Sequence, residues 1–279
     1  MRTFILLFQC RDQKGIVARI SEFILKNQGN IITADQHSTD FESGYFFIRV
    51  EFLIDTQVNK ETLNADFMLV GKQFNADWRI YDKADTLRMG ILVSDQGHCL
   101  ADILYLWGSG ELKVNIPFVL SNSPKHEKLV KQYNLPFYLV SATKDDRREK
   151  EILERAAKET DFLVLARYML VFSEDFLRRY AKDIINIHHG FLPSFKGADP
   201  YGKALQQGVK VIGATAHFVN EQLDEGPIIS QEVESVSHKD NRDDLVRKGR
   251  NLEKKALANA VFSYLDHRII RHENKTIVF

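Results

Sequence analysis

Hydrophobic and polar positions in the first 82 residues follow two periods. Apolar residues spaced three and four apart predict helices over about 16–27 and over 59–75. The runs that suit strands lie at 3–9, 29–39, 43–54 and 76–82, the middle two joined around Asp40 to Glu42. In 43–54 apolar side chains alternate with more polar ones, as in a strand with one buried face. The order is βαββαβ, which predicts a ferredoxin-like unit with two helices on one face of a four-stranded antiparallel sheet.

After a polar linker at 82–88, apolar runs alternate with helical segments. The runs that suit parallel strands are 89–94, 114–120, 137–140, 162–166 and 184–188, and the helical segments are 100–108, 124–134, 147–160 and 174–180. This alternation predicts an open, Rossmann-like α/β sheet, which binds ligands at the carboxyl ends of its strands. We therefore expect two domains, 1–82 and 83–279. The second ends in a helix at 243–265 and a scaffold hairpin at 268–279.

Composition excludes several classes of function. The 279 residues carry 38 basic and 38 acidic side chains, a balance that argues against nucleic acid or an anionic membrane as partner. No apolar run approaches the ~20 residues of a membrane span, and the run near the first residue is too short for a signal peptide core. Two distant cysteines exclude a disulfide framework and a cysteine-based zinc site. We expect a cytoplasmic protein.

Candidate chemistry is concentrated between residues 184 and 227. An apolar strand ends in Asn186, His188 and the adjacent His189. A third histidine, His217, lies within an apolar run, and Asp224 comes shortly before a Gly-Pro turn. Each residue alone has a structural explanation as a cap, a buried histidine or a turn residue. A metal site is not expected, because the adjacent His188 and His189 would point to opposite faces of a strand.

Taken together, these motifs resemble the folate-dependent formyltransferase family over about 88–235. The resemblance rests on Asn186-Ile187-His188, Leu192-Pro193-Ser194-Phe195, Gly213 to His217 and Asp224 to Ile229. It implies a catalytic triad of Asn186, His188 and Asp224. It also implies a folate-pocket loop with the substrate-binding positions Leu165, Ala166, Arg167, Tyr168 and Met169. Thr215, His217 and Gly226 are further substrate-binding positions. Of these, Thr215 and His217 would lie behind the triad.

Residues 1–82 resemble the ACT domain, a regulatory module that often binds amino acids. The motif is Asp12 to Val17 followed by Gly29-Asn30-Ile31. It makes Asp12, Lys14, Gly15 and Ile16 candidate regulatory residues, since free N–H groups at a helix start suit a carboxylate. For Asp12 and Lys14, solvated loop charges are the plain alternative. The resemblance implies an amino-acid effector such as methionine or glycine.

An ACT-like domain before a formyltransferase fold resembles the formyltetrahydrofolate deformylase family. The resemblance implies hydrolysis of 10-formyltetrahydrofolate to formate and tetrahydrofolate, which supplies formate and balances the one-carbon folate pool for purine biosynthesis. Folate is then the substrate, no separate cofactor or metal is expected, and the assembly is a homotetramer. The turn Ser94 to Leu100 has one glycine where the purine-pathway transferases have a Gly- and Ser-rich phosphate loop.

The residue types suit this chemistry. Water attacking a formamide gives a tetrahedral oxyanion, to which Asn186 and a donor form of His188 can hydrogen-bond. His188 can then protonate the leaving nitrogen, while Asp224 orients the water and accepts its proton. Two alternatives stay open: a transferase that passes the formyl group to an amine, and a sensing or folate-binding protein with an inactive catalytic domain.

Overall fold

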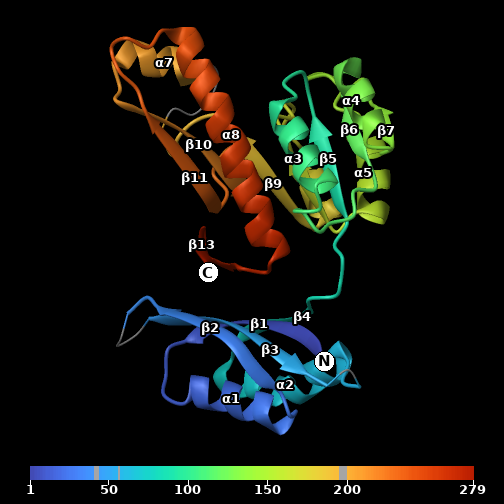
Figure 1. Cartoon of the computed structure of the whole chain (residues 1–279), viewed down its shortest axis with the longest axis vertical. Helices are drawn as coiled ribbons and strands as arrows, with labels where there is room; N and C mark the ends of the chain where they lie inside the picture. Colours follow the sequence, from blue (N-terminus) through green and yellow to red (C-terminus); the bar gives the residue numbers. More distant parts are fainter. Residues whose placement is uncertain (41–43, 56, 195–199) are drawn as a thin grey trace. The chain divides into compact units, whose positions relative to one another are not determined.

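The computed structural model describes residues 1–40, 44–55, 57–194 and 200–279. It divides into two compact units, shown in Figure 1. Unit 1 consists of Met1–Thr86 together with Asp266–Phe279, and unit 2 is Leu87–Leu265. The two ends of the chain therefore belong to the same unit.

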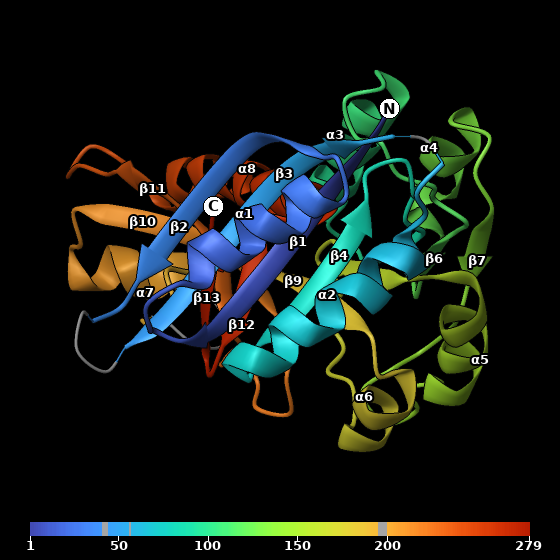
Figure 2. The same cartoon turned by 90° about the horizontal axis from the view of Figure 1, so that it is seen from below.

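Unit 1 has the predicted βαββαβ order. Its elements are β1 (Arg2–Arg11), α1 (Ile16–Lys26), β2 (Asn30–Ser38), β3 (Tyr45–Ile54), α2 (Lys60–Phe74) and β4 (Asp77–Asp82). The antiparallel sheet has the order β2-β3-β1-β4. Both helices lie along one face of it (Figure 2), where Phe8, Phe23 and Phe67 are buried in a common core. In the expected turn between β2 and β3, Phe41 and Glu42 lie outside the described residues.

The carboxyl-terminal hairpin covers the other face of this sheet. It is formed by β12 (Ile269–His272) and β13 (Lys275–Val278). Ile270 joins Ile5, Leu7 and Phe47 in a second cluster, and these side chains point away from the helices because strand residues alternate between faces. The expected boundary 83–279 is therefore wrong for the hairpin. The sequence could not predict that this hairpin packs on the sheet of unit 1, because the hairpin lies far along the chain from β1 to β4.

Unit 2 is an α/β sandwich built on one mixed sheet. Its strands are β5 (Met89–Val93), β6 (Val119–Ser121), β7 (Phe137–Leu139), β8 (Phe162–Leu165), β9 (Asp183–His188), β10 (Val211–Phe218) and β11 (Ile228–Ser235). Its helices are α3 (His98–Gly108), the 3₁₀ turn Pro124–His126 with α4 (Glu127–Gln132), α5 (Glu149–Glu159), α6 (Glu174–Tyr180), α7 (Pro200–Gln207) and α8 (Arg242–Leu265). The sheet order is β11-β10-β9-β8-β5-β6-β7, and β10 alone is antiparallel to its two neighbours.

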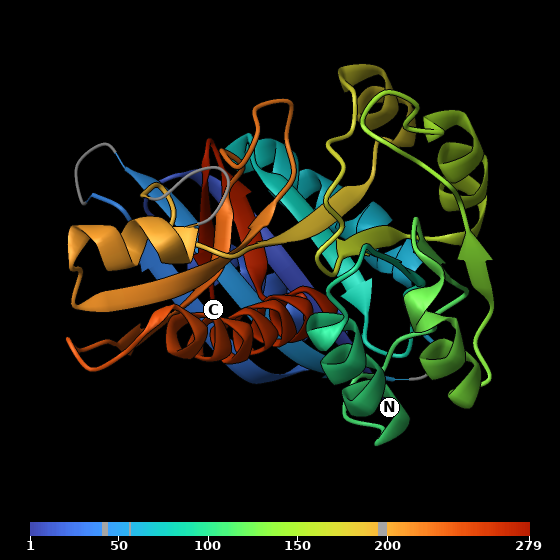
Figure 3. The same ribbon diagram turned by 90° about the horizontal axis from the view of Figure 1, so that it is seen from above.

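Helices cover both faces of this sheet. On one face, α5 and α6 pack through Ile152 and Phe176 onto Leu163 and Ile184. On the other face, the ring of Tyr264 in α8 lies 4.5 Å from that of Phe162, the strand neighbour of Leu163. Figure 3 shows α8 beside α3 on this second face. The predicted doubly wound architecture is confirmed, and its carboxyl edge is where the candidate residues converge.

Two expectations for unit 2 need correction. The strand expected at 114–120 becomes regular only at Val119, because Pro117 has no N–H to donate to a ladder. Helix α7 was not expected, since its eight residues begin with Pro200 and include few apolar side chains. Among the described residues, no helix is both long and apolar enough to cross a bilayer.

Candidate active site

The end of β9 carries two of the candidate catalytic side chains. Asn186 and His188 are two residues apart in the strand, so both point to the face that carries α5 and α6. The antiparallel register of β10 sets His217 directly opposite Asn186 and Thr215 opposite His188. Strand pairing, which brings together residues about thirty positions apart, therefore builds this side of the site.

Asp224 reaches the same place from the loop between β10 and β11. Its backbone is left-handed (φ 55°), a conformation that Asp and Asn tolerate better than most residues. The loop is held by the hydrogen bond from the Phe218 amide to the Pro227 carbonyl, 2.9 Å. Gly226 is required there, because an added Cβ would lie 1.8 Å from the Phe218 oxygen. The Gly-Pro turn thus aims Asp224 at the strand ends and gives Gly226 a structural role.

The three predicted catalytic residues come together. Nδ1 of His188 lies 3.2 Å from Oδ2 of Asp224, and Nε2 of His217 lies 3.6 Å from Oδ1. Burial opposes ionisation of Asp224, but its pairing with His188 outweighs the burial and holds the pKa of this carboxyl far below its usual range. Asp224 is therefore a carboxylate at neutral pH.

The second ring nitrogen of His188 has an unusual environment. The side chain is 5% exposed, and Nε2 is buried without a hydrogen-bond partner among the described residues. Buried polar atoms in folded proteins are nearly always paired. An unpaired imidazole nitrogen whose partner nitrogen is held by a carboxylate is typical of a group that transfers a proton to or from a ligand.

His217 orients Asn186. Its Nδ1 lies 2.8 Å from the Phe218 carbonyl oxygen, which can only accept a hydrogen bond, so Nδ1 carries the proton. In the neutral ring Nε2 is then an acceptor, and it lies 3.2 Å from Nδ2 of Asn186. One amide N–H of Asn186 is thereby committed to His217, and the other remains for a ligand.

Thr215 supports the loop that follows β9. Its hydroxyl donates to the Gly190 carbonyl (2.9 Å) and accepts from the Leu192 amide (3.1 Å) and from Nε2 of Gln231 (3.1 Å). Gln231, in β11, also donates to the Leu192 carbonyl and was not expected to take part. With its hydroxyl already committed, Thr215 acts behind the site and not on a substrate. Phe195, the last residue of the expected motif Leu192 to Phe195, lies outside the described residues.

The predicted folate-pocket loop follows β8. The side chains of Leu165 and Tyr168 are buried in the hydrophobic cluster under α5 and α6, and Ala166 is fully buried. Only Met169, which is 52% exposed, presents a large apolar side chain outward. The loop is tied to the turn after β5 by hydrogen bonds from the Ser94 amide to the Arg167 carbonyl and from the Met169 amide to the Ser94 hydroxyl.

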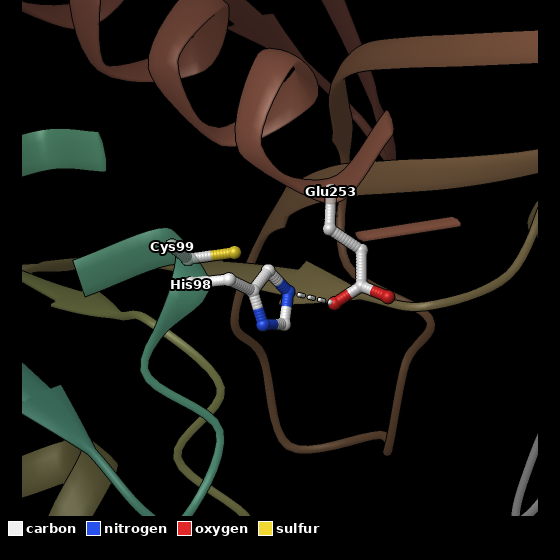
Figure 4. Close-up of side chains that lie close together, drawn as sticks. All are labelled: His98, Cys99 and Glu253. Carbon is white, nitrogen blue, oxygen red and sulfur yellow. Dashed lines mark hydrogen bonds and ion pairs between the residues drawn. The ribbon is translucent and has the colours of Figure 1, made fainter. Parts of the chain in front are cut away.

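A second polar cluster lies at the same edge and was missed in the sequence. Glu253 of α8, 2% exposed, accepts hydrogen bonds from Tyr201 (2.7 Å) and His98 (2.8 Å) and lies 3.3 Å from Nε of Arg167. Figure 4 shows His98 and Cys99 leaving the start of α3 while Glu253 reaches toward them from α8. We call Arg167, His98, Tyr201 and Glu253 the Glu253 cluster. A regular helix with an inward glutamate gives little sequence signal.

Two members of the Glu253 cluster, His98 and Glu253, form with the adjacent Cys99 a set of donors that could in principle hold a metal. Its electrostatics do not favour one. Both carboxylate oxygens of Glu253 already accept hydrogen bonds, and the Arg167 guanidinium supplies the compensating positive charge. Burial raises the pKa of the Cys99 thiol well above its usual value, so the thiolate that a metal binds is disfavoured.

His189 lies between the two groups of polar residues. Its ring centroid is 5.2 Å from that of His188 and 6.2 Å from that of Tyr201. Burial, together with the positive charge of Arg167 and the neighbouring His188, lowers the pKa of His189 to about 4. It is therefore neutral at physiological pH, and it lies between the candidate catalytic residues and the Glu253 cluster.

The predicted regulatory residues lie in unit 1, on the turn before α1. Gly15 has φ 93° and begins the helix, whose first turn carries no acidic side chain and no side-chain cap. Asp12 accepts a hydrogen bond from the Ser38 hydroxyl, and Lys14 is exposed. Ile16 is 2% exposed and belongs to the core, so its side chain is structural.

Residues 87–261 match the family model described as formyl transferase. The chain is 47% identical to a formyltetrahydrofolate deformylase of Synechocystis, covering 99% of this chain and 98% of that one. A formyltetrahydrofolate deformylase of Pseudomonas syringae, solved by crystallography, superimposes with a TM-score of 0.95 at 42% identity, covering 100% of this chain and 95% of that one. A glycinamide ribonucleotide transformylase of Symbiobacterium toebii gives 0.66 at 26% identity, covering 71% of this chain and 97% of that one.

Proposed function

Because the chain belongs to the formyl transferase family, and within it to the formyltetrahydrofolate deformylases, we propose that Asn186, His188 and Asp224 are its catalytic residues. The enzyme hydrolyses 10-formyltetrahydrofolate to formate and tetrahydrofolate. The bond broken is the formamide bond between the formyl carbon and the folate nitrogen. The site therefore has to activate water, stabilise an oxyanion and protonate an amine.

His188 is the proton carrier in this proposal. Asp224 holds its Nδ1–H at 3.2 Å, so the lone pair of neutral His188 is on Nε2. Nε2 takes a proton from the attacking water, and the water oxygen forms a bond to the formyl carbon. The same proton then passes from Nε2 to the folate nitrogen as the bond from the formyl carbon to that nitrogen breaks. Formate and tetrahydrofolate leave, and His188 returns to its neutral form.

This division of roles differs from the one expected from the residue types alone. Asp224 was expected to accept the proton from water. A carboxyl group whose pKa is held far below its usual range is a weak proton acceptor. Asp224 is better suited to fixing the tautomer of His188 and stabilising its protonated form.

Asn186 stabilises the oxyanion. His217 accepts one of its amide hydrogens, which leaves the other to donate to the oxygen that becomes negative during attack. A single such donor is typically worth about 10²–10³ in rate. We place the folate ring against the loop 165–169. Its contacts come from the backbone and from Met169, because Leu165 and Tyr168 are packed in the core.

The single observation that carries the mechanism is the buried Nε2 of His188, which has no partner among the described residues. The test is turnover of 10-formyltetrahydrofolate with no amine acceptor present, with formate and tetrahydrofolate both quantified. Equal amounts of the two products support hydrolysis by this site. Their absence in the parent chain, or their undiminished release by His188→Ala, would contradict the proposal. The transferase alternative is not favoured, because the relatives that match the full chain are named as deformylases.

Regulation belongs to unit 1 in this proposal. The free N–H groups at the start of α1 suit the carboxylate of an amino acid, and an added Cβ at Gly15 would meet no atom within 4 Å. Methionine and glycine are the effectors we would test first. The working form is a homotetramer in the cytoplasm, and both cysteines are unpaired, as is usual in a reducing compartment.

A further inference from the structure

The Glu253 cluster lies on the face of the sheet opposite the catalytic residues. Asn186 and His188 point to the α5/α6 face. Glu253 belongs to α8, on the other face, and His98 belongs to α3, which packs beside α8. The two groups meet only at the carboxyl edge of the strands, where His189 lies between them.

Arg167 links the cluster to the loop that follows β8. Leu165, the last residue of β8, pairs with Asn186 in the parallel ladder of β8 and β9. Arg167 lies two residues beyond the end of β8, has a left-handed backbone (φ 68°) and pairs with Glu253. The guanidinium that pairs with Glu253 therefore comes from the loop next to the strand that carries Asn186 and His188.

The side chains of the Glu253 cluster are mostly buried and packed against one another. Glu253, Tyr201 and Cys99 are buried, and the side chains of Arg167 and His98 are 12% and 16% exposed. Gly249, one turn before Glu253 in α8, leaves room for Tyr201, since an added Cβ there would lie 2.0 Å from the tyrosine oxygen. The hydrogen bonds of Tyr201 and His98 lock their side chains against the carboxylate.

The nucleophile of the reaction indicates what filling this space with side chains could achieve. Hydrolysis and formyl transfer share the donor, the oxyanion and the leaving nitrogen, and differ only in the nucleophile. As a nucleophile, water needs the space of only one small molecule, whereas an amine acceptor needs a wider approach to the formyl carbon. With the donor on the α5/α6 face, the remaining approach over the strand ends is from the α3/α8 face.

We propose that the Glu253 cluster determines the reaction specificity by occupying the approach that an amine acceptor would need, so that water is the nucleophile. This inference rests on the proposed function. It predicts that shortening a cluster side chain allows transfer. The amine nitrogen would bond to the formyl carbon, the bond from that carbon to the folate nitrogen would break, and the amine proton would pass to the folate nitrogen.

The test uses the full chain, 10-formyltetrahydrofolate and a small amine, glycinamide. Tetrahydrofolate, formate and N-formylglycinamide are quantified, and the ratio of formylated amine to formate is the readout. Tyr201→Ala opens space, whereas the matched control Tyr201→Phe keeps the ring volume and removes only the hydroxyl. His98→Ala is a second, smaller opening that does not involve α7.

The parent chain and Tyr201→Phe should release formate with no formylated glycinamide. Tyr201→Ala or His98→Ala should form the amide in proportion to the glycinamide concentration, with a ratio at least tenfold above the detection limit of the assay. The proposal is overturned if the parent forms the amide equally well, if Tyr201→Phe behaves like Tyr201→Ala, or if the folded opened variants hydrolyse but do not transfer. Loss of hydrolysis in both opened variants would also overturn it, because the cluster would then belong to the hydrolytic machinery. Failure of the parent to hydrolyse the donor would instead refute the proposed function.

Discussion

His188 and Asp224 form a directed pair: Nδ1 of the imidazole lies 3.2 Å from a carboxylate oxygen, and Nε2 is buried without a partner among the described residues. The carboxylate approaches from a left-handed residue in the loop after β10, and the imidazole lies at the end of β9. One nitrogen is thus used to set the tautomer and the other is left for the reaction.

Asp224→Asn should lower kcat by roughly 10²–10⁴, the typical contribution of acid–base help, with little change in KM. Asn tolerates the left-handed backbone of this position, so the loop should keep its conformation. Steady-state kinetics measures the effect. Glu225→Gln removes the neighbouring exposed carboxylate and serves as the control. Near-normal kcat in Asp224→Asn would mean that Asp224 only shapes the turn.

His217→Phe should lower kcat about fivefold, because Asn186 loses the acceptor that orients its amide and a hydrogen bond of this kind is worth about 1 kcal/mol. The effect should be absent in a background that already carries Asn186→Ala. A double-mutant cycle on kcat measures this coupling. Additive effects of the two substitutions would show that His217 acts on something other than Asn186.

Exhaustive dialysis against a chelator should leave turnover unchanged. The expected mechanism uses only the side chains of Asn186, His188 and Asp224, and the Arg167 guanidinium already neutralises Glu253 in the other cluster. Activity and metal content are measured on the same samples. Loss of turnover that zinc restores would contradict both the mechanism and the assignment of the Glu253 cluster.

The catalytic unit should be produced as residues 87–265 and not as 83–279. In the longer fragment Ile270, 5% exposed in the full chain, loses its partners Ile5, Leu7 and Phe47. Size-exclusion chromatography should find 87–265 well folded and 83–279 prone to association. Residues 87–265 should hydrolyse the donor without a response to amino acids. A folded fragment that binds folate but has no activity would show that unit 1 contributes to the chemistry.

Acid should weaken unit 1 through His267. Burial, with the charge of Arg49, lowers the pKa of His267 from 6.5 to about 4. Between pH 6.5 and about 4, His267 binds a proton in the unfolded chain but not in the folded chain. Stability is therefore complete above pH 6.5 and falls as the pH drops toward 4, by roughly 2 kcal/mol for a partly shielded group.

Denaturant unfolding at a series of pH values measures this loss. His267→Asn keeps a residue that accepts the left-handed backbone and should flatten the pH dependence between 4 and 6.5. His238→Asn changes an exposed histidine and should leave the dependence as in the parent chain. An unchanged slope in His267→Asn would assign the acid sensitivity to other groups.

The sequence by itself determined the order of elements and predicted the residue types of the proposed catalytic set. The two hydrophobic periods predicted the βαββαβ unit and the open α/β sheet, because periodicity is a local property of the chain. Asn186 and His188 could be assigned to one strand face, since alternate residues share a face.

Only the tertiary structure decided which distant groups meet. Sequence pattern could not place the hairpin at 269–278 on the sheet of unit 1, because an apolar ribbon has many possible partners until the chain is folded. It also could not reveal the Glu253 cluster, whose four side chains come from a loop and three helices. Nor could it divide the roles of His188 and Asp224, because the free nitrogen of an imidazole depends on which nitrogen the folded chain hydrogen-bonds.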